Sequence, residues 1–364
     1  MERVLFEEHR TDRPSNQRWE LHDDLAEVIC RCENIWESLQ GARIFLTGGT
    51  GFIGCWLLEA LRHANRQLDL GLQVTILTRN LSAFQTKAPH LASYGSFRFI
   101  AGNVADFAFP GGEFSHLIHA ATDASADLNE RNPRQMFDTV LLGTRRTLDF
   151  GLAKSVKRCL FLSSGAVYGQ QPWELEQVPE TWTGAPDCVN PKNTYAEAKR
   201  AAEMLCSIYY KQFGLEVSIA RIFALLGPYL ALDIHFAAGN FILDALRGRP
   251  VIVQGNGRPC RSYLYASDLT VWLLHMLVRG QPGKAYNVGS NETVSIAELA
   301  ERTARLIGNG EFQVLNAGDT GWNPGRYVPN TDLVGQELGL YKTVSLDQAI
   351  VRTALWQGWN KQGD

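Results

Sequence analysis

Residues 47–54 read TGGTGFIG, a glycine-rich stretch of the kind that joins a strand to a helix. It follows the short apolar run Arg43-Ile44-Phe45-Leu46 and leads into a helical pattern. In a strand–turn–helix of this kind, Gly48 allows the tight turn, Gly51 lets a pyrophosphate approach the backbone, and Gly54 permits close helix packing. The stretch therefore predicts a dinucleotide site; the alternative is a glycine-rich turn without a ligand.

Short apolar strands alternate with helical patterns around this loop. Strands are predicted over residues 43–46, 74–77, 97–100, 116–119, 159–162 and 217–221, with helices around 134–153 and around Tyr195. This alternation indicates βαβ units and a parallel sheet. We therefore predict an α/β fold, a Rossmann-type doubly wound parallel sheet with a smaller C-terminal α/β substrate domain.

The same alternation of strands and helices divides the chain into three predicted segments. Residues 1–40 are predicted to be an N-terminal extension in which Asp23 and Asp24 cap an amphipathic helix over 23–40. Residues 41–225 are predicted to form the NAD(P)-binding Rossmann domain. Residues 226–364, where turns become frequent, are predicted to be mainly a substrate-binding domain over the carboxyl ends of the strands.

Composition narrows the class of protein. The 364 residues are 45% hydrophobic and carry a net charge of −3, which argues against nucleic acid or a membrane surface as a partner. The seven scattered cysteines form no CxxC pair, so we expect reduced thiols and no metal site. No apolar run approaches the length of a membrane span, and we expect a cytoplasmic protein.

The residues after the second and third strands bear on the choice of cofactor. An acidic residue at the end of the second strand selects NAD, but Arg79 stands there and would pair with a 2′-phosphate. NADP is therefore favoured slightly over NAD, unless Arg79 is a solvated residue that stacks on adenine. Asn103 is predicted to meet the adenine edge, with an ordinary turn Asn as the alternative.

A Tyr/Lys pair indicates proton transfer at an alcohol. Tyr195 and Lys199 lie one helical turn apart on the same face. A free tyrosine is a poor base at neutral pH, but a nearby lysine charge favours the phenolate. Ser164, at the end of the fifth strand, would hydrogen-bond the same substrate oxygen. We predict Ser164, Tyr195 and Lys199 as the catalytic residues.

Together these motifs resemble the extended short-chain dehydrogenase/reductases, the NAD(P)-dependent sugar-nucleotide epimerase/dehydratase family. The resemblance covers about residues 41–345. It is carried by the stretches 47–54, 119–121, 163–169, 261–265 and 286–289, and by Tyr195, Lys199, Arg221 and Asp268.

The resemblance implies a transient oxidation, usually at C4 of a nucleotide-linked sugar, by a homodimer. It assigns the base to Tyr195, the hydroxyl partner to Ser164 and the ribose contact to Lys199. The cofactor-binding residues are predicted to be Gly48, Thr50, Gly51, Phe52, Ile53, Gly54, Arg79, Asn103, Val104, Ala120, Ala121 and Lys199. The substrate-binding residues are predicted to be Ser164, Asn240, Arg261 and Arg326.

The chain departs from the family pattern near the catalytic hydroxyl. In the dehydratases and related decarboxylases an acidic residue commonly follows that hydroxyl, whereas Gly165 and Ala166 stand here. This argues against a dehydratase, although Asp123 lies where another family acid can sit. Ala224 and Val140 replace two asparagines that are usual in the family.

Three hypotheses follow. The first is a nucleotide-sugar epimerase that retains its cofactor, favoured by the uncharged Gly165-Ala166 pair. The second is an NADPH-dependent reductase of a 4-keto sugar nucleotide, favoured by Arg79. The third is a non-catalytic nucleotide-sensing protein on the same fold. The sequence leaves open the sugar and the nucleotide base.

Overall fold

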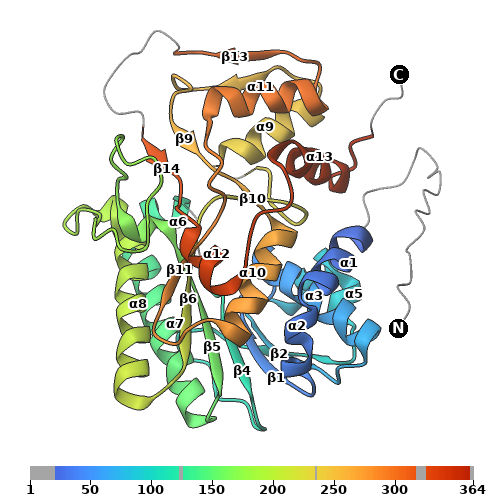
Figure 1. Cartoon of the computed structure of the whole chain (residues 1–364), viewed down its shortest axis with the longest axis vertical. Coiled ribbons are helices and arrows are strands. Elements are labelled where there is room, and N and C mark those ends of the chain that lie inside the picture. Colours follow the sequence, from blue (N-terminus) through green and yellow to red (C-terminus); the bar gives the residue numbers. More distant parts are fainter. Residues whose placement is uncertain (1–20, 123–125, 234–235, 317–324, 361–364) are drawn as a thin grey trace.

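A seven-stranded parallel sheet forms the centre of the molecule in the computed structural model, which describes residues 21–122, 126–233, 236–316 and 325–360 (Figure 1). The strand order is β11-β6-β5-β4-β1-β2-β3. The strands are β1 (Arg43–Thr47), β2 (Gln73–Thr78), β3 (Phe97–Ala101), β4 (His116–His119), β5 (Arg158–Ser164), β6 (Val217–Ile222) and β11 (Ala285–Val288). The predicted doubly wound parallel sheet is confirmed.

Alternation along the strands divides the core between the two faces of the sheet. Ile44 and Leu46 of β1 belong to one buried cluster, whereas Phe45 belongs to another. This is the period of two that a strand imposes on its side chains. Helices α3 (Phe52–Leu68) and α10 (Ala266–Arg279) contribute to the first cluster, and α7 (Pro133–Ala153) and α8 (Thr194–Phe213) to the second. The sheet is therefore covered on both faces. Between the strands lie the shorter helices α4 (Leu81–Lys87), α5 (Pro89–Ala92) and α6 (Ala126–Arg131).

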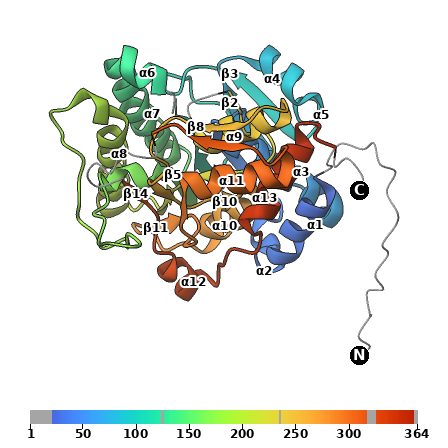
Figure 2. The same ribbon diagram turned by 90° about the horizontal axis from the view of Figure 1, so that it is seen from above.

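Smaller sheets and helices lie above the central sheet (Figure 2). The two- and three-stranded sheets pair β7 (Leu225–Leu226) with β10 (Leu264–Tyr265), β8 (Val251–Val253) with β13 (Phe312–Val314), and β9 (Cys260–Arg261) with β12 (Val294–Ser295) and β14 (Arg326–Tyr327). The helices of this part are α9 (Ala237–Leu246), α11 (Ile296–Ile307) and α13 (Leu346–Trp356), whereas α12 (Asp332–Leu338) packs against β11 of the central sheet and against α10.

All six predicted strands are present, but the sequence reading missed the seventh. Strand β11 lies inside the segment predicted to be mainly substrate-binding, and it pairs in parallel with β6 at the edge of the central sheet. Its four residues include Asn287, which interrupts the apolar pattern. The Asn287 side chain is nevertheless fully buried, because it bonds Tyr168 and two backbone carbonyls.

The single helix predicted over residues 23–40 is wrong. The chain forms α1 (His22–Arg31), α2 (Glu33–Trp36) and the 3-10 turn η1 (Glu37–Leu39), with a break at Cys32. The break reorients the chain, so that Ile35, Trp36 and Leu39 are all buried. Part of the predicted extension, residues 1–20, lies outside the described residues.

Asp24 was predicted to cap this helix, and it does not. The helix begins after Leu21 without a side-chain cap. Asp24 lies in the first turn and is only 1% exposed. Its carboxylate accepts hydrogen bonds from Tyr265 at 2.7 Å and from Arg352 at 2.6 Å, and these bonds compensate for the loss of water. At the other end of α1, Arg31 donates to the buried Asp268 at 2.5 Å. The helix is thereby tied to residues that lie 237 to 328 positions further along the chain.

In the described part of the chain, no helix is both long and apolar enough to cross a membrane.

Candidate active site

The nucleotide loop connects β1 to α3, and contacts with the backbone fix its shape. Gly48 has φ +73°, and a Cβ at this position would lie 2.5 Å from the Ala120 carbonyl carbon. A Cβ at Gly54 would lie 2.3 Å from the Gly48 oxygen. A Cβ at Gly51 would meet only the Gly48 oxygen, at an ordinary 3.4 Å. Gly51 therefore faces open space, as a position that admits a pyrophosphate should.

Helix α3 begins at this open space. Its N-cap is Gly51, which brings no side chain to cap the first turn. Phe52 and Ile53 open the helix, and the partial positive charge of a helix N-terminus favours phosphate. The geometry fits a dinucleotide pyrophosphate at the predicted loop residues.

A buried hydrogen-bond relay holds the neighbouring loop at Ala120 and Ala121. The Ala121 N–H donates to Thr47 Oγ1 at 3.1 Å, and Thr47 Oγ1 lies 2.7 Å from His119 Nδ1. His119 Nε2 lies 3.0 Å from Thr144 Oγ1, whose hydroxyl donates to the Val140 carbonyl. Because the Thr144 hydroxyl already donates its hydrogen to Val140, Thr144 Oγ1 has to accept a hydrogen bond from His119. The neutral imidazole therefore carries its proton on Nε2. Burial, followed by the charge of Lys199, lowers the pKa of His119 to about 3, so the imidazole is neutral.

The structure brings the three predicted catalytic residues together. The Lys199 ammonium lies 5.9 Å from the centre of the Tyr195 ring, and it donates to the Leu162 carbonyl at 2.7 Å. Burial lowers the pKa of Lys199 to about 8, although the Glu203 carboxylate raises it. Burial raises the pKa of Tyr195, whereas its hydrogen bond with Ser164 lowers it. Ser164 ends β5, and α8 carries the other two residues.

Glu203, one turn beyond Lys199 on α8, connects the elements that carry Ser164, Tyr195 and Lys199. It accepts from Ser163 Oγ at 2.6 Å and from Arg221 Nη2 at 2.7 Å. Arg221 also donates to the Tyr168 hydroxyl at 2.8 Å. Ser163 precedes Ser164, and Arg221 lies on β6. The network therefore fixes α8 against β5 and β6 immediately behind the predicted catalytic residues.

Two aromatic residues that the sequence analysis did not predict complete the site. The Tyr327 hydroxyl lies 3.5 Å from Ser164 Oγ, so a second phenol, besides that of Tyr195, faces the Ser164 hydroxyl. The ring of Phe223 lies 4.5 Å from that of Tyr327. A Cβ at Gly165 would lie 2.6 Å from the Phe223 ring. Phe223 thus occupies the space that a side chain at residue 165 would need.

Two of the predicted substrate arginines lie beside Tyr327. Strand β14 pairs with β9 so that Tyr327 is opposite Arg261, and Arg326 directly precedes Tyr327. Arg326 lies over the Trp173 ring at 4.5 Å, and its Nε is buried without a hydrogen-bond partner among the described residues. Such an orphan donor suits a polar ligand.

The other predicted site residues are less closely gathered. Asn240 is exposed on α9, and the described contacts do not join it to the catalytic group. Arg79 is exposed directly after β2. Asn103 accepts from the Ala105 N–H in a turn, and Val104 is buried against α7 at Gly143. Asp123 lies outside the described residues.

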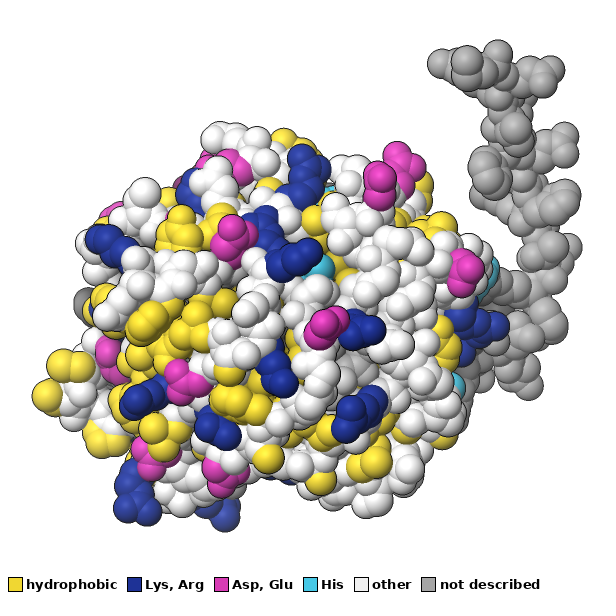
Figure 3. All heavy atoms as spheres, turned by 90° about the horizontal axis from the view of Figure 1, so that it is seen from below, with side chains coloured by type: hydrophobic (Ala, Val, Ile, Leu, Met, Phe, Trp, Pro, Cys, Tyr) yellow, Lys and Arg dark blue, Asp and Glu magenta, His cyan; other side chains and the backbone are white. Residues whose placement is uncertain are grey.

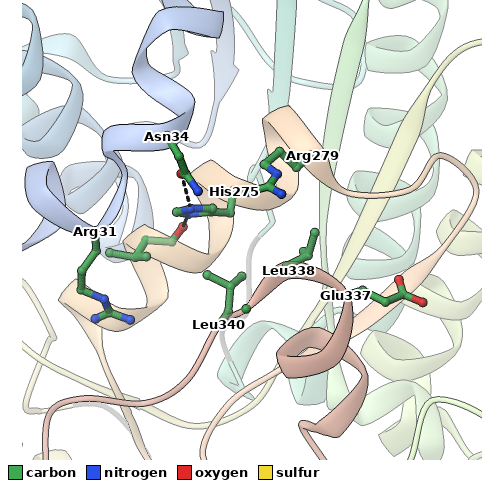
Figure 4. Close-up of a pocket in the computed structure, with 9 residues that line it drawn as sticks. Arg31, Asn34, His275, Arg279, Glu337, Leu338 and Leu340 are labelled. Carbon is green, nitrogen blue, oxygen red and sulfur yellow. Dashed lines mark hydrogen bonds between the residues drawn. The ribbon is translucent and has the colours of Figure 1, made fainter.

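A cavity of about 440 Å³ lies elsewhere, between α2, the second half of α10 and the end of α12 (Figure 4). His275 and Asn34 bond each other across it at 3.1 Å. Arg31, also in its lining, is bound to Asp268. None of the predicted site residues lines this cavity.

Comparison with known proteins agrees with this geometry. Residues 44–289 match the model of the NAD dependent epimerase/dehydratase family. The chain is 31% identical over 313 residues to UDP-glucuronic acid decarboxylase 1 of Xenopus tropicalis, covering 85% of this chain and 71% of that protein. It is 30% identical over 309 residues to UDP-glucuronic acid decarboxylase 6 of Arabidopsis thaliana, covering 85% and 86%.

Solved structures share the fold. UDP-glucose 4-epimerase of Thermotoga maritima aligns with a TM-score of 0.71 at 21% identity, covering 86% of this chain and 98% of that one. dTDP-glucose 4,6-dehydratase of Bacillus anthracis, in complex with NAD, aligns with a TM-score of 0.72 at 20% identity, covering 87% and 96%.

A Rossmann sheet with this loop and a Tyr/Lys pair on α8 defines an extended short-chain dehydrogenase/reductase. Within that class, the chain belongs to the NAD-dependent epimerase/dehydratase family, and it is an NAD(P)-dependent enzyme.

Proposed function

We propose that this enzyme is a nucleotide-sugar epimerase that works through transient oxidation at C4 of the sugar. The observation that carries the proposal is the Ser164, Tyr195 and Lys199 group, set beside a Gly165 that Phe223 packs against. Epimerisation needs one proton acceptor and a hydride carrier. It needs no additional acid for elimination, and Phe223 occupies the space that an acidic side chain at residue 165 would need.

The three residues divide the work by position. NAD(P), held by the loop of residues 48–54 and by Lys199, would supply the acceptor and donor of the hydride at the sugar carbon. Tyr195 takes the proton of the hydroxyl, while Ser164 holds the same oxygen. The Lys199 charge favours the Tyr195 phenolate. Because the Lys199 pKa is about 8, that charge is lost as the pH rises through this value.

The substrate we propose is a uridine diphosphate sugar. The curated relatives are named for UDP-glucuronic acid and a solved relative for UDP-glucose. Arg261 and Arg326 lie on the paired strands β9 and β14, beside the Tyr327 that faces Ser164. Guanidinium groups suit a diphosphate, because their fork of donors matches its oxygens.

We also infer that NADP is preferred to NAD. Arg79 supports this preference, because it stands where a carboxylate would hold the ribose hydroxyls of NAD. The same residue supports a second candidate function, the NADPH-dependent reduction of a 4-keto sugar nucleotide. That enzyme would exchange its cofactor in each turnover, whereas the epimerase would retain it.

The test identifies the nucleotide released from the purified, denatured protein and then assays UDP-glucose, UDP-galactose and UDP-glucuronate. The proposal expects retained NAD(P), interconversion of C4 epimers and no net change in near-ultraviolet absorbance. Release of carbon dioxide from UDP-glucuronate would identify a decarboxylase and overturn the proposal. Stoichiometric loss of added NADPH with a 4-keto substrate would establish the reductase instead.

A further inference from the structure

Lys87, the last residue of α4, is held against the nucleotide loop. Its ammonium donates to the Thr50 carbonyl at 3.1 Å and lies 5.7 Å from the centre of the Tyr229 ring. It is also hydrogen-bonded to the Cys55 thiol in the first turn of α3. The exposed Lys87 thus contacts the start of α3, the helix that borders the predicted cofactor site.

These contacts leave the charge of Lys87 without a compensating anion. A carbonyl, a phenol ring and a thiol are neutral, and burial raises the pKa of Cys55 to about 11. The nearby Glu59 carboxylate is bound by the Tyr229 hydroxyl and by His90 Nε2, each at 2.6 Å. Within residues 21–122 and the other described ranges, Lys87 forms no ion pair.

Arg79 brings a second cation to the same edge of the sheet. Strands β1 and β2 are parallel neighbours, with Thr47 opposite Leu77. Thr50 lies three residues beyond Thr47, and Arg79 lies two residues beyond Leu77. Because the carboxyl ends of parallel neighbours meet at one edge, Arg79 and the Thr50 that Lys87 contacts follow adjacent strand ends.

We propose that Lys87 acts with Arg79 to bind the 2′-phosphate on the adenosine ribose of NADP. The inference rests on the proposed preference for NADP and adds a residue that sequence position did not reveal. An anion with two charges suits two cations of this kind, one a fork of donors and the other a compact point charge. The competing explanation is that Lys87 only braces the Thr50 loop, which would support NAD and NADP equally.

The experiment compares two probes that differ only in the 2′-phosphate, adenosine 2′,5′-bisphosphate and AMP. Their affinities are measured by calorimetry on the full chain after retained nucleotide has been exchanged out. We expect the wild type to bind the bisphosphate more tightly. Lys87→Gln should weaken the bisphosphate about tenfold and leave AMP unchanged, as expected for one charge-assisted contact. Lys87→Arg should retain the preference, and Lys211→Gln, a distant exposed lysine, is the matched control.

The outcomes separate this inference from the proposed cofactor preference. If the wild type binds both probes equally, the preference for NADP is wrong, and the role of Lys87 is lost with it. If Arg79→Gln abolishes the wild-type preference but Lys87→Gln does not, the preference stands and the role of Lys87 is refuted. Equal weakening of both probes by Lys87→Gln would identify a loop brace and overturn the inference.

Discussion

At the scale of single residues, Tyr195 has the most direct chemical role that we propose. Replacing Tyr195 by Phe should lower kcat about 10²- to 10⁴-fold, the usual contribution of a general base. NAD(P)H binding should be unchanged, because the ribose contact is assigned to Lys199. Steady-state kinetics and nucleotide titration measure the two effects. Tyr210→Phe, an exposed tyrosine on the same helix, is the control and should keep full activity.

For His119 we predict an effect on the stability of the folded protein rather than on the rate of the reaction. Its pKa is about 3 in the folded protein against 6.5 for the free side chain, so the unfolded chain binds one more proton between these values. The contribution of His119 to the free energy of unfolding should therefore be fully present above pH 6.5 and fall by about 1.4 kcal/mol per pH unit below it.

The measurement for His119 is urea unfolding between pH 5 and pH 7.5. His119→Gln should be less stable overall, because it breaks the relay to Thr47 and Thr144. Its stability should nevertheless lose less on acidification than that of the wild type. Identical pH slopes in the two proteins would show that His119 is not neutral and buried in the folded protein.

At the scale of elements, α1 is an integral part of the fold rather than an appendage. Asp24 has a side chain with 0% exposure and pairs with Arg352 of α13, which is 22% exposed. Removing one member of a buried pair leaves the other uncompensated. Asp24→Asn should lower the free energy of unfolding by about 3 kcal/mol, measured by urea titration. The control Glu37→Gln removes the same charge from an exposed position nearby and should have little effect.

The elements also show what local sequence can and cannot predict. The glycines of residues 47–54 and the four-residue spacing of Tyr195 and Lys199 are local patterns, and they predicted the loop and the helix that carries this pair. Glu203 continues that spacing by one more turn, so the same pattern held a signal for it. Tyr327 had no such signal, because it meets Ser164 across 163 positions of the chain.

The break at Cys32 was hidden for a related reason. Apolar residues recur at near-helical spacing from Leu25 to Leu39, and this pattern alone favours one continuous helix. In the structure Trp36 Nε1 instead donates back to the Ile29 carbonyl, and the chain turns to bury Ile35 and Leu39. Tertiary packing decides where this helix ends.

At the scale of the whole molecule, we predict a homodimer. Helices α7 and α8 pack against each other, and each exposes apolar side chains, with Leu142 46%, Met204 63% and Ile208 40% exposed. Figure 3 shows hydrophobic side chains gathered on the left of the lower face, the side on which α7 and α8 lie in Figure 1. Large exposed apolar patches mark association surfaces.

Light scattering coupled to size-exclusion chromatography tests this prediction. The wild type should elute with the mass of two chains, and Met204→Glu should shift it toward the mass of one. Gln212→Glu, which adds the same charge at an exposed position of α8, should leave the dimer intact. A wild type that is monomeric at all concentrations would contradict the prediction.

The pairing of Asp24 with Arg352 also sets an order of events during synthesis. The two residues are 328 positions apart, and Arg31 likewise meets Asp268 across 237 positions. At about 5–20 residues per second on the ribosome, the 328 positions between the two residues take roughly 16–66 seconds to translate, so Asp24 is made well before Arg352. Until then the first helix holds a carboxylate that cannot be buried without cost. The nascent β1–α3 region can form earlier, but the docking of α1 that buries Asp24 has to follow translation of α13, so α1 is among the later elements of the described residues to reach its final position.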